Sequence, residues 1–423
     1  MGTNKPRIAI VGGGPAGLTL GVLLHKRNIP FTIFELRAQP TDAELDEPSG
    51  LLDLHEDSGL EAIRSCGLMD EFIPLTDVCS QSMAVADHCS SILHCNEGGF
   101  ENKPEISRHD LTRLLLRHLP TNSIRWQRKL FSATLGATEG VAVTTLNFGP
   151  HGTEDFDFVV GADGAWSRVR PLLTDVKPSY TGHQSITATI RNITRKYPAL
   201  AEFVGTGTLF CLGSGNCVMS HRAAQDSAIV YICVPSEDPD LLAATAEQPA
   251  SQAKDLLLGD DKLFRAFTGT ARKLIVAACD EDSRGRPGQN ADFRRLYALP
   301  AGHSWMHKAG VTLVGDASHV MSPFAGEGVN VAMWDSLDLA GVIAAAWEKS
   351  PKDAAAFQTA MDGPLIEFEK KMAERAGVRA QEAIGNTGLI FAADGAKAMA
   401  AFFQNAYESS GEELPGQAPP PGR

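Results

Sequence analysis

Residues 7–35 read RIAIVGGGPAGLTLGVLLHKRNIPFTIFE. The apolar run at 7–11 is typical of a buried β-strand, and the glycines that follow break it. Leucine and valine then recur at helical spacing between Leu18 and Leu24, and the run at 31–35 indicates a second strand. A strand, a glycine-rich turn, a helix and a second strand within about 30 residues predict the βαβ unit of a dinucleotide-binding fold.

Three glycines in this turn, Gly12, Gly14 and Gly17, have the spacing GxGxxG. Gly12 permits the tight turn, Gly14 lets the backbone approach a pyrophosphate, and Gly17 lets the helix pack closely on the strand. Glu35 ends the second strand, 18 residues beyond Gly17, where a carboxylate accepts hydrogen bonds from ribose hydroxyls. An ordinary turn can carry the same glycines, but the flanking elements and Glu35 favour nucleotide binding. Glu35 favours an unphosphorylated ribose, as in FAD or NAD, over that of NADP.

Two later segments carry related patterns. Residues 159–170 read VVGADGAWSRVR, a strand that ends in Asp163, which taken alone indicates only a turn. Residues 313–330 read LVGDASHVMSPFAGEGVN, in which a strand ends in Asp316 and glycines open the next helix. Asp316 can accept a ribitol hydroxyl, and the backbone N–H groups near Gly328 can face an anionic ring. The alternative is a glycine-rich helix start that Asp316 caps.

The composition excludes several classes of function. The chain has 423 residues, 43% of them hydrophobic, enough for two or three domains with substantial cores. A net charge of −13 lacks the basic footprint that nucleic acid requires. The eight cysteines form no CxxC pair, so we expect reduced thiols in the cytoplasm, with no disulfide framework and no metal site. The apolar stretch 8–24 contains Pro15 and five glycines, and we expect no segment with the roughly 20 apolar residues of a membrane span.

Together, GxGxxG at 12–17, DGxxSxVR at 163–170 and GDAxHxxxPxxGxGxN at 315–330 resemble the class A FAD-dependent aromatic hydroxylases. The resemblance extends from residue 7 to about residue 345. Within that class, residues 50–68, which begin GLLDLH, are similar to the tetracycline-inactivating monooxygenases, and so is PEISRHDL at 104–111.

The resemblance implies where FAD binds. It assigns the pyrophosphate to the GxGxxG turn, the adenosine ribose to Glu35, ribitol to Asp316 and the flavin ring to the segment after Pro323. The implied cofactor-binding residues are Gly12, Gly14, Ala16, Gly17, Glu35, Arg37, Asp53, Arg108, Asp163, Asp316, Pro323, Gly326, Gly328, Val329 and Asn330.

The expected fold is mixed α/β, with a Rossmann-like FAD-binding domain and an inserted antiparallel-sheet substrate domain. Alternating runs at 185–190 and 227–234 predict the sheet, and the resemblance implies a C-terminal helix that bridges the domains. The expected bounds are 1–75, 105–176 and 299–345 for the FAD-binding domain, 76–104 and 177–298 for the substrate-binding domain, 352–408 for a C-terminal helical region interrupted at Pro364, and 409–423 for a disordered tail.

The implied function is that of an FAD-dependent monooxygenase. Such an enzyme uses NADPH or NADH and O₂ to hydroxylate a polycyclic phenol or enol through a flavin C4a-hydroperoxide, and tetracycline is one candidate substrate. The cofactor carries this chemistry, so we assign no catalytic residue, and we interpret His319 as structural. The alternatives are a hydroxylase of another aromatic polyketide or phenol, a reductase or oxidase that inserts no oxygen, and a non-catalytic FAD-fold binding protein, which would not need the cradle at 316–330. The similar enzymes imply a monomer.

The sequence departs from the tetracycline enzymes at two places. Thr187 and Cys217 stand where those enzymes have a Gln and an Arg, and losing an arginine contact costs about 1.5–3 kcal/mol. His221 and Phe324 complete the implied substrate contacts, although a solvated turn also accounts for His221. Residues 42–47, DAELDE, carry four carboxylates where the relatives have an arginine that meets the NADPH phosphate. We therefore predict a smaller preference for NADPH over NADH, unless this is a flexible acidic loop remote from the reductant.

Overall fold

The computed structural model describes residues 5–76, 82–96, 103–138 and 140–410, with side chains as far as residue 405. The glycine-rich turn lies at one end of a five-stranded parallel sheet, in the order β17-β11-β1-β2-β7. Two helices, α1 (Pro15–Lys26) and α11 (Gly328–Lys349), pack together on this sheet. The strands are β1 (Ile8–Val11), β2 (Thr32–Phe34), β7 (Ile124–Arg125), β11 (Phe158–Gly161) and β17 (Val311–Leu313).

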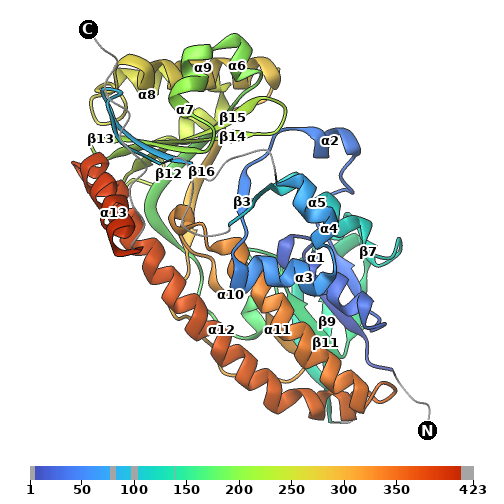
Figure 1. Ribbon diagram of the computed structural model, residues 1–423. Coiled ribbons are helices and arrows are strands. Elements are labelled where there is room, and N and C mark those ends of the chain that lie inside the picture. The colour runs from blue at the N-terminus through green and yellow to red at the C-terminus, as the bar shows by residue number, and fades with distance from the viewer. Residues whose placement is uncertain (1–4, 77–81, 97–102, 139, 411–423) are drawn as a thin grey trace.

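A seven-stranded sheet forms the other half of the molecule, in the order β16-β12-β15-β14-β13-β4-β5 (Figure 1). Its pairs are antiparallel except for β13 with β4. The strands are β4 (Met83–Asp87), β5 (Ile92–Asn96), β12 (Ser179–Ile190), β13 (Thr208–Gly213), β14 (Asn216–Ala223), β15 (Ser227–Pro235) and β16 (Asp292–Ala298).

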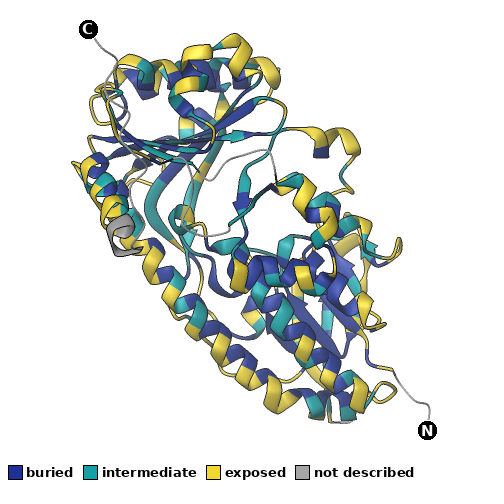
Figure 2. Ribbon diagram, viewed as in Figure 1, coloured by how far each residue is buried: buried dark blue, intermediate teal, exposed yellow. Residues whose placement is uncertain are grey.

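The two faces of this sheet have different surroundings, because successive side chains on a strand point to opposite faces. The outer face packs on α7 (Pro198–Val204), α8 (Ala250–Gly259) and α9 (Gly269–Gly285) through apolar, buried side chains. Figure 2 shows the buried residues of these strands and helices in dark blue. The inner face is turned toward the five-stranded half and carries His183, Thr187, Phe210, Leu212, Cys217, Met219, His221, Tyr231 and Cys233.

The two halves are joined by a short sheet and a long helix. Strand β3 (Leu51–Asp53) pairs with β6 (Glu105–Ser107) between them. Helix α12 (Ala354–Ile390) packs on α11 and runs along one side of the molecule to α13 (Gly395–Ser410), beside the seven-stranded sheet (Figure 1). The remaining helices are α2 (Asp42–Asp46), α3 (Glu61–Cys66), α4 (Met69–Phe72), α5 (Arg108–Arg117), α6 (Ile193–Lys196) and α10 (Asp316–His319), and a further sheet contains β8 (Ser132–Thr138), β9 (Val141–Asn147) and β10 (Thr153–Phe156).

The mixed α/β class is confirmed, and three finer expectations need correction. Pro364 does not interrupt the C-terminal helix: the lost backbone donor costs about 3 kcal/mol, but Met361, Leu365 and Phe368 are buried on both sides of it and hold α12 together. The predicted tail starts too early, because α13 continues to Ser410, while 411–423 lie outside the described residues. Among the described residues one helix, α11, does have the length and apolar composition of a membrane span; 61% of its most apolar window is buried in the protein, as in a core helix.

Candidate active site

In the β1–α1 turn, the fold requires glycine at two positions but not at a third. Gly12 has φ +114°, and a Cβ on it would lie 2.1 Å from the Ala162 carbonyl oxygen. A Cβ on Gly17 would lie 2.0 Å from the Gly12 oxygen, whereas a Cβ on Gly14 would meet nothing within 4 Å. Gly14 precedes α1, whose first N–H groups receive no side-chain cap, and Ala16 lies in its first turn. Open space beside free N–H groups suits a pyrophosphate.

Glu35 lies next to this turn, at the end of β2. Its buried carboxylate accepts hydrogen bonds from the Gly13 N–H at 2.7 Å, the Arg37 N–H at 2.9 Å and Arg37 Nε at 2.7 Å. Burial alone would raise the pKa of Glu35, but the hydrogen bonds and charge of Arg37, with the Gly13 bond, lower it below the usual value. The carboxylate is therefore ionised and fixed, while the Arg37 side chain is largely exposed.

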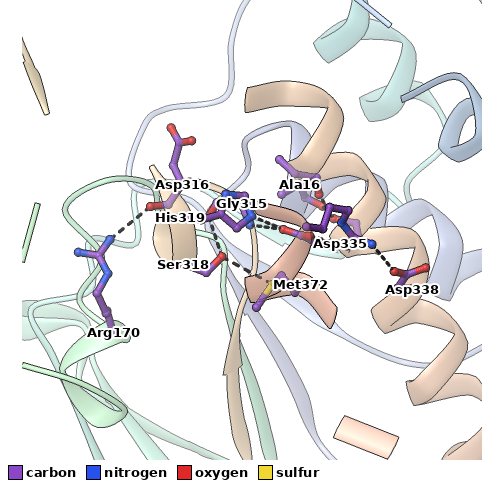
Figure 3. Close-up of polar contacts among 12 residues, drawn as sticks. Ala16, Arg170, Gly315, Asp316, Ser318, His319, Asp335, Asp338 and Met372 are labelled. Atoms are coloured by element: carbon purple, nitrogen blue, oxygen red, sulfur yellow. Dashed lines mark hydrogen bonds and ion pairs between the residues drawn. The ribbon is translucent and has the colours of Figure 1, made fainter. Parts of the chain in front are cut away.

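Asp316 and Arg108 line a recess in the protein. Both residues are exposed to solvent, yet burial raises the pKa of Asp316 and lowers that of Arg108. Side chains that are accessible and desolvated at once must line a recess rather than the outer surface. Each charge acts on the other, and Figure 3 shows the Asp316 carboxylate pointing away from the polar cluster beneath it. The recess thus offers an acceptor and a cation to one ligand.

A buried ion network holds the Asp316 turn in place (Figure 3). The Asp335 carboxylate lies 2.6 Å from His319 Nε2 and 2.8 Å from Arg375 Nη2, and it accepts the Gly315 N–H at 3.0 Å. Burial opposes charge on His319, but Asp335 raises the pKa of this histidine above its usual value, so the pair is ionised. His319 is thus a structural partner of Asp335. Sequence reasoning missed Asp335 and Arg375, because they meet only where α11 packs against α12.

The second aspartate motif is tied to the same turn. Asp163 Oδ2 accepts the Arg168 N–H at 2.7 Å, and burial raises the pKa of this carboxyl. Arg170 Nε donates to the Ala317 carbonyl at 2.7 Å, and Arg170 Nη2 donates to the Ala165 carbonyl at 2.8 Å. Arg170 therefore links the motif at 163–170 with the one at 315–330.

The start of α11 contacts strand β3, which pairs with β6 directly before Arg108. Asn330 Nδ2 donates to the Asp53 carbonyl at 2.8 Å, and Asn330 Oδ1 accepts the His55 N–H at 2.9 Å. Gly326 has φ +70°, and a Cβ on it would lie 3.2 Å from the Asp53 carboxylate oxygens. No side chain caps α11, and a Cβ on Gly328 would meet nothing within 4 Å. Free N–H groups at this helix start can stabilise an anion. Pro323 is exposed and Val329 half-buried beside them.

The four predicted substrate residues fall into two groups. Thr187 and Phe324 are half-buried, Thr187 on the inner face of the sheet and Phe324 in the turn before α11. Cys217 is fully buried in an apolar cluster with Cys233, and burial raises the pKa of its thiol. His221 is almost fully buried; its Nε2 accepts the Leu51 N–H at 3.3 Å, and burial lowers its pKa to about 4.

The structure adds inner-face residues that sequence reasoning missed. Tyr231 pairs across the strands with Thr187, and its hydroxyl lies 2.6 Å from the position of a Cβ on Gly50. Burial raises the pKa of Tyr231 to about 12. Its position in SAIVYICV, as the one polar side chain beyond the first residue of an apolar strand, was a signal that could have identified it. Half-buried apolar side chains continue the inner face, namely Phe210, Met219, Phe324, Leu389 and Phe391. Within the described ranges no group of three or more His, Cys, Asp or Glu is placed to hold a metal ion.

Comparisons with known proteins agree with this geometry. The profile of the family described as "FAD binding domain" matches residues 5–257 and 301–355. Monooxygenase penA of Penicillium thymicola is 34% identical over 407 residues, which cover 88% of this chain and 93% of that protein. Two solved structures are similar in fold. Klebsiella pneumoniae HpxO complexed with FAD and uric acid has a TM-score of 0.71 at 18% identity, covering 95% of this chain and 93% of that one. The tetracycline destructase Tet(55) has a TM-score of 0.70 at 18% identity, covering 99% and 100%.

Proposed function

The chain belongs to the FAD-dependent monooxygenases that share this FAD-binding domain, and we propose that it uses NAD(P)H and O₂ to hydroxylate an aromatic or enolic ring that carries a hydroxyl group. One observation carries the proposal: the recess lined by Gly14, Asp316 and the start of α11 adjoins the half-buried aromatic inner face of the second sheet. Such an arrangement brings a flavin ring and a planar substrate together.

The residues of the recess suit FAD. When bound, FAD supplies the transfer of electrons from the reductant and the activation of O₂. The α1 N–H groups beside Gly14 would bind the pyrophosphate, Glu35 the ribose and Asp316 the ribitol. The Arg108 guanidinium and the free N–H groups at the start of α11 would stabilise negative charge on the ring. With FAD and substrate bound, the protein atoms around the recess would exclude water from the reacting atoms.

We assign the halves of the molecule accordingly. The FAD-binding domain would comprise 1–75, 105–176 and 299–345, and the substrate-binding domain 76–104 and 177–298, with the C-terminal helices bridging them. Helix α12 packs on α11 and β9, and α13 packs on β4, β5 and β13, which supports this division. We also propose a monomer in the cytoplasm, which the free state of the seven described cysteines supports.

The substrate is best sought among polycyclic phenols and enols. The inner face offers Phe210, Met219 and Phe391 for an apolar ring system, and Thr187 and Tyr231 for its oxygen atoms. Tetracycline is one member of this class, and Tet(55) is named a tetracycline destructase. However, Thr187 and the buried Cys217 supply no charged contact, so another polycyclic phenol is the first choice.

The test is incubation of the purified holoenzyme with NADPH or NADH, ¹⁸O₂ and a panel of polycyclic phenols that includes tetracycline. We expect a product heavier by one labelled oxygen atom for at least one phenol. Oxidation of the reductant with no label in any product would identify a reductase or oxidase instead. Purified protein without bound flavin would point to a binding protein, which the intact cradle at 316–330 argues against.

A further inference from the structure

A β-bulge in β12 places a histidine on the inner face. Tyr180 pairs with Tyr297 of β16, and the next pair is Gln184 with Arg295, so β12 advances four residues while β16 advances two. Gly182 lies inside this bulge with φ +80°, and its carbonyl accepts the Ser236 N–H at 2.8 Å. Bulges next to functional sites re-aim a side chain, and here the re-aimed side chain is that of His183.

His183 joins two phenylalanine rings at the border between the recess and the inner face. Its ring centroid lies 4.5 Å from that of Phe391 and 6.2 Å from that of Phe324, and the two phenylalanines are 5.2 Å apart, edge to face. Phe324 belongs to the turn that leads into the start of α11, and Phe391 follows the end of α12. Three distant segments thus build one aromatic wall around an imidazole.

The hydrogen bonds of the imidazole fix which nitrogen is free. Nδ1 lies 2.9 Å from the Thr181 carbonyl oxygen, so Nδ1 carries the hydrogen and Nε2 presents a lone pair. His183 is half-buried, and within the described residues no hydrogen bond to Nε2 is formed. Burial lowers the pKa of His183 and the Thr181 bond raises it in part, and no charged neighbour contributes. The ring is therefore neutral near pH 7.

We propose that His183 Nε2 takes the proton of the ring hydroxyl of an aromatic substrate that packs against Phe324 and Phe391. This rests on the proposed function and supplies the base that the sequence did not reveal. The O–H bond of the substrate breaks, its electron pair stays on oxygen, and an N–H bond forms at Nε2, with no change of oxidation state. The resulting imidazolium and phenolate are jointly neutral, so burying them costs less than burying either charge alone. A phenolate ring is electron-rich, as hydroxylation requires.

The test uses 4-nitrophenol, whose colour reports its ionisation, bound to oxidised holoenzyme without reductant. Difference spectra across pH are compared for wild type, His183→Phe and His183→Gln. The phenylalanine keeps a ring against Phe324 and Phe391, and the glutamine keeps an acceptor that cannot take the proton. The matched control is His88→Phe, a half-buried histidine whose ring lies 6.0 Å from that of Phe267, outside the recess.

In wild type we expect bound 4-nitrophenol to ionise at a pH at least about one unit below that in His183→Phe, a tenfold effect. His183→Gln should bind the probe within about threefold of wild-type affinity and still lose the shift, whereas His88→Phe should keep it. Equal ionisation in wild type and both His183 variants would overturn the proposal, and so would failure of wild type to bind the probe. Oxygen labelling reports separately: labelled product with no probe shift rejects only the base, and a probe shift without labelled product rejects only the hydroxylase.

Discussion

At the recess, the atoms that would meet FAD are mostly backbone, whereas on the inner face the atoms that would meet substrate are side chains. Gly14 and Gly328 would contribute bare N–H groups at helix starts, with Glu35, Asp316 and Arg108 as the side-chain contacts. The inner face instead presents rings and hydroxyls, such as those of Phe391 and Tyr231, which the end of α12 and strand register bring together.

This difference determines what each region tolerates. A backbone site is destroyed by any side chain that enters it, but it is indifferent to most changes nearby. A side-chain site can change its ligand by single substitutions without disturbing the fold. Substitutions should therefore rarely change which cofactor the recess binds, but they should readily change which substrate the inner face binds.

Gly14→Leu should have the largest effect of the changes that test the difference between recess and inner face. The residue has φ −83°, which any residue adopts, and its Cβ would meet no protein atom. The folded protein should accept leucine at a cost of about 1 kcal/mol for the poorer helix cap. The side chain fills the space assigned to the pyrophosphate, so FAD affinity should fall at least about 100-fold. Fluorescence titration of the deflavinated protein with FAD measures the affinity.

The control for this change is Gly341→Leu, on the exposed side of α11, where a Cβ also meets nothing. It should bind FAD like wild type. Thr187→Val is the counterpart on the inner face and should leave FAD affinity within about twofold while changing substrate affinity. Full FAD binding by Gly14→Leu would show that the recess is not a backbone site.

The same difference explains how much the sequence could predict. Gly12, Gly17 and Glu35 act through local spacing, so the βαβ unit and its nucleotide function could be inferred from 29 consecutive residues. Asp316 is preceded by a strand and followed by a helix start, which made its position recognisable. Backbone sites of this kind are specified by consecutive residues.

His183, Tyr231 and Phe391 are different, because a local pattern can single out a polar residue such as Tyr231 but cannot place it beside the others. His183 needs a bulge, Tyr231 needs the register of β12 with β15, and Phe391 needs the course of a 37-residue helix. Cys217 shows the converse: the resemblance assigned it to substrate, but in the structure neighbouring core residues bury its thiol completely.

His221 offers a test of where the two regions are joined, since it binds the Leu51 N–H of β3. In the folded protein its pKa is about 4, against about 6.5 for an unfolded chain. The unfolded state therefore binds the proton more readily, and stability falls as pH drops through 6.5 toward 4. Between about pH 7 and about pH 5 this residue should account for roughly 2 kcal/mol of lost stability.

His221→Gln keeps an acceptor for Leu51 but does not titrate in this range. Urea unfolding at both pH values should show a loss smaller than that of wild type by roughly 2 kcal/mol. His88→Gln, in the distant β4–β5 hairpin, should lose stability as wild type does. If the free energy of unfolding of His221→Gln equals that of wild type at both pH values, His221 is not the acid-sensitive link.

The acidic segment 42–47 tests the comparison with the smallest expected effect, because it touches both halves of the molecule. The Asp46 carbonyl accepts a hydrogen bond from Gln225, and Glu47 pairs with Arg191 at 2.7 Å. Asp46 pairs with Arg113, so two of the four carboxylates at 42–47 are neutralised. The negative charge that remains near Asp42 should repel the 2′-phosphate of NADPH only weakly. We expect a kcat/KM for NADPH no more than about threefold that for NADH.

Asp42→Lys reverses the charge at the exposed start of α2 and should raise the NADPH-to-NADH ratio about threefold at low ionic strength. The gain should shrink toward zero in about 1 M salt, where the screening length is only about 3 Å. Glu202→Lys, at an exposed position of α7, makes the same change in net charge and should leave the ratio unchanged. An equal rise in both variants would mean that net charge, and not the position of α2, governs the reductant, and α2 would then not lie on the reductant's path between recess and inner face.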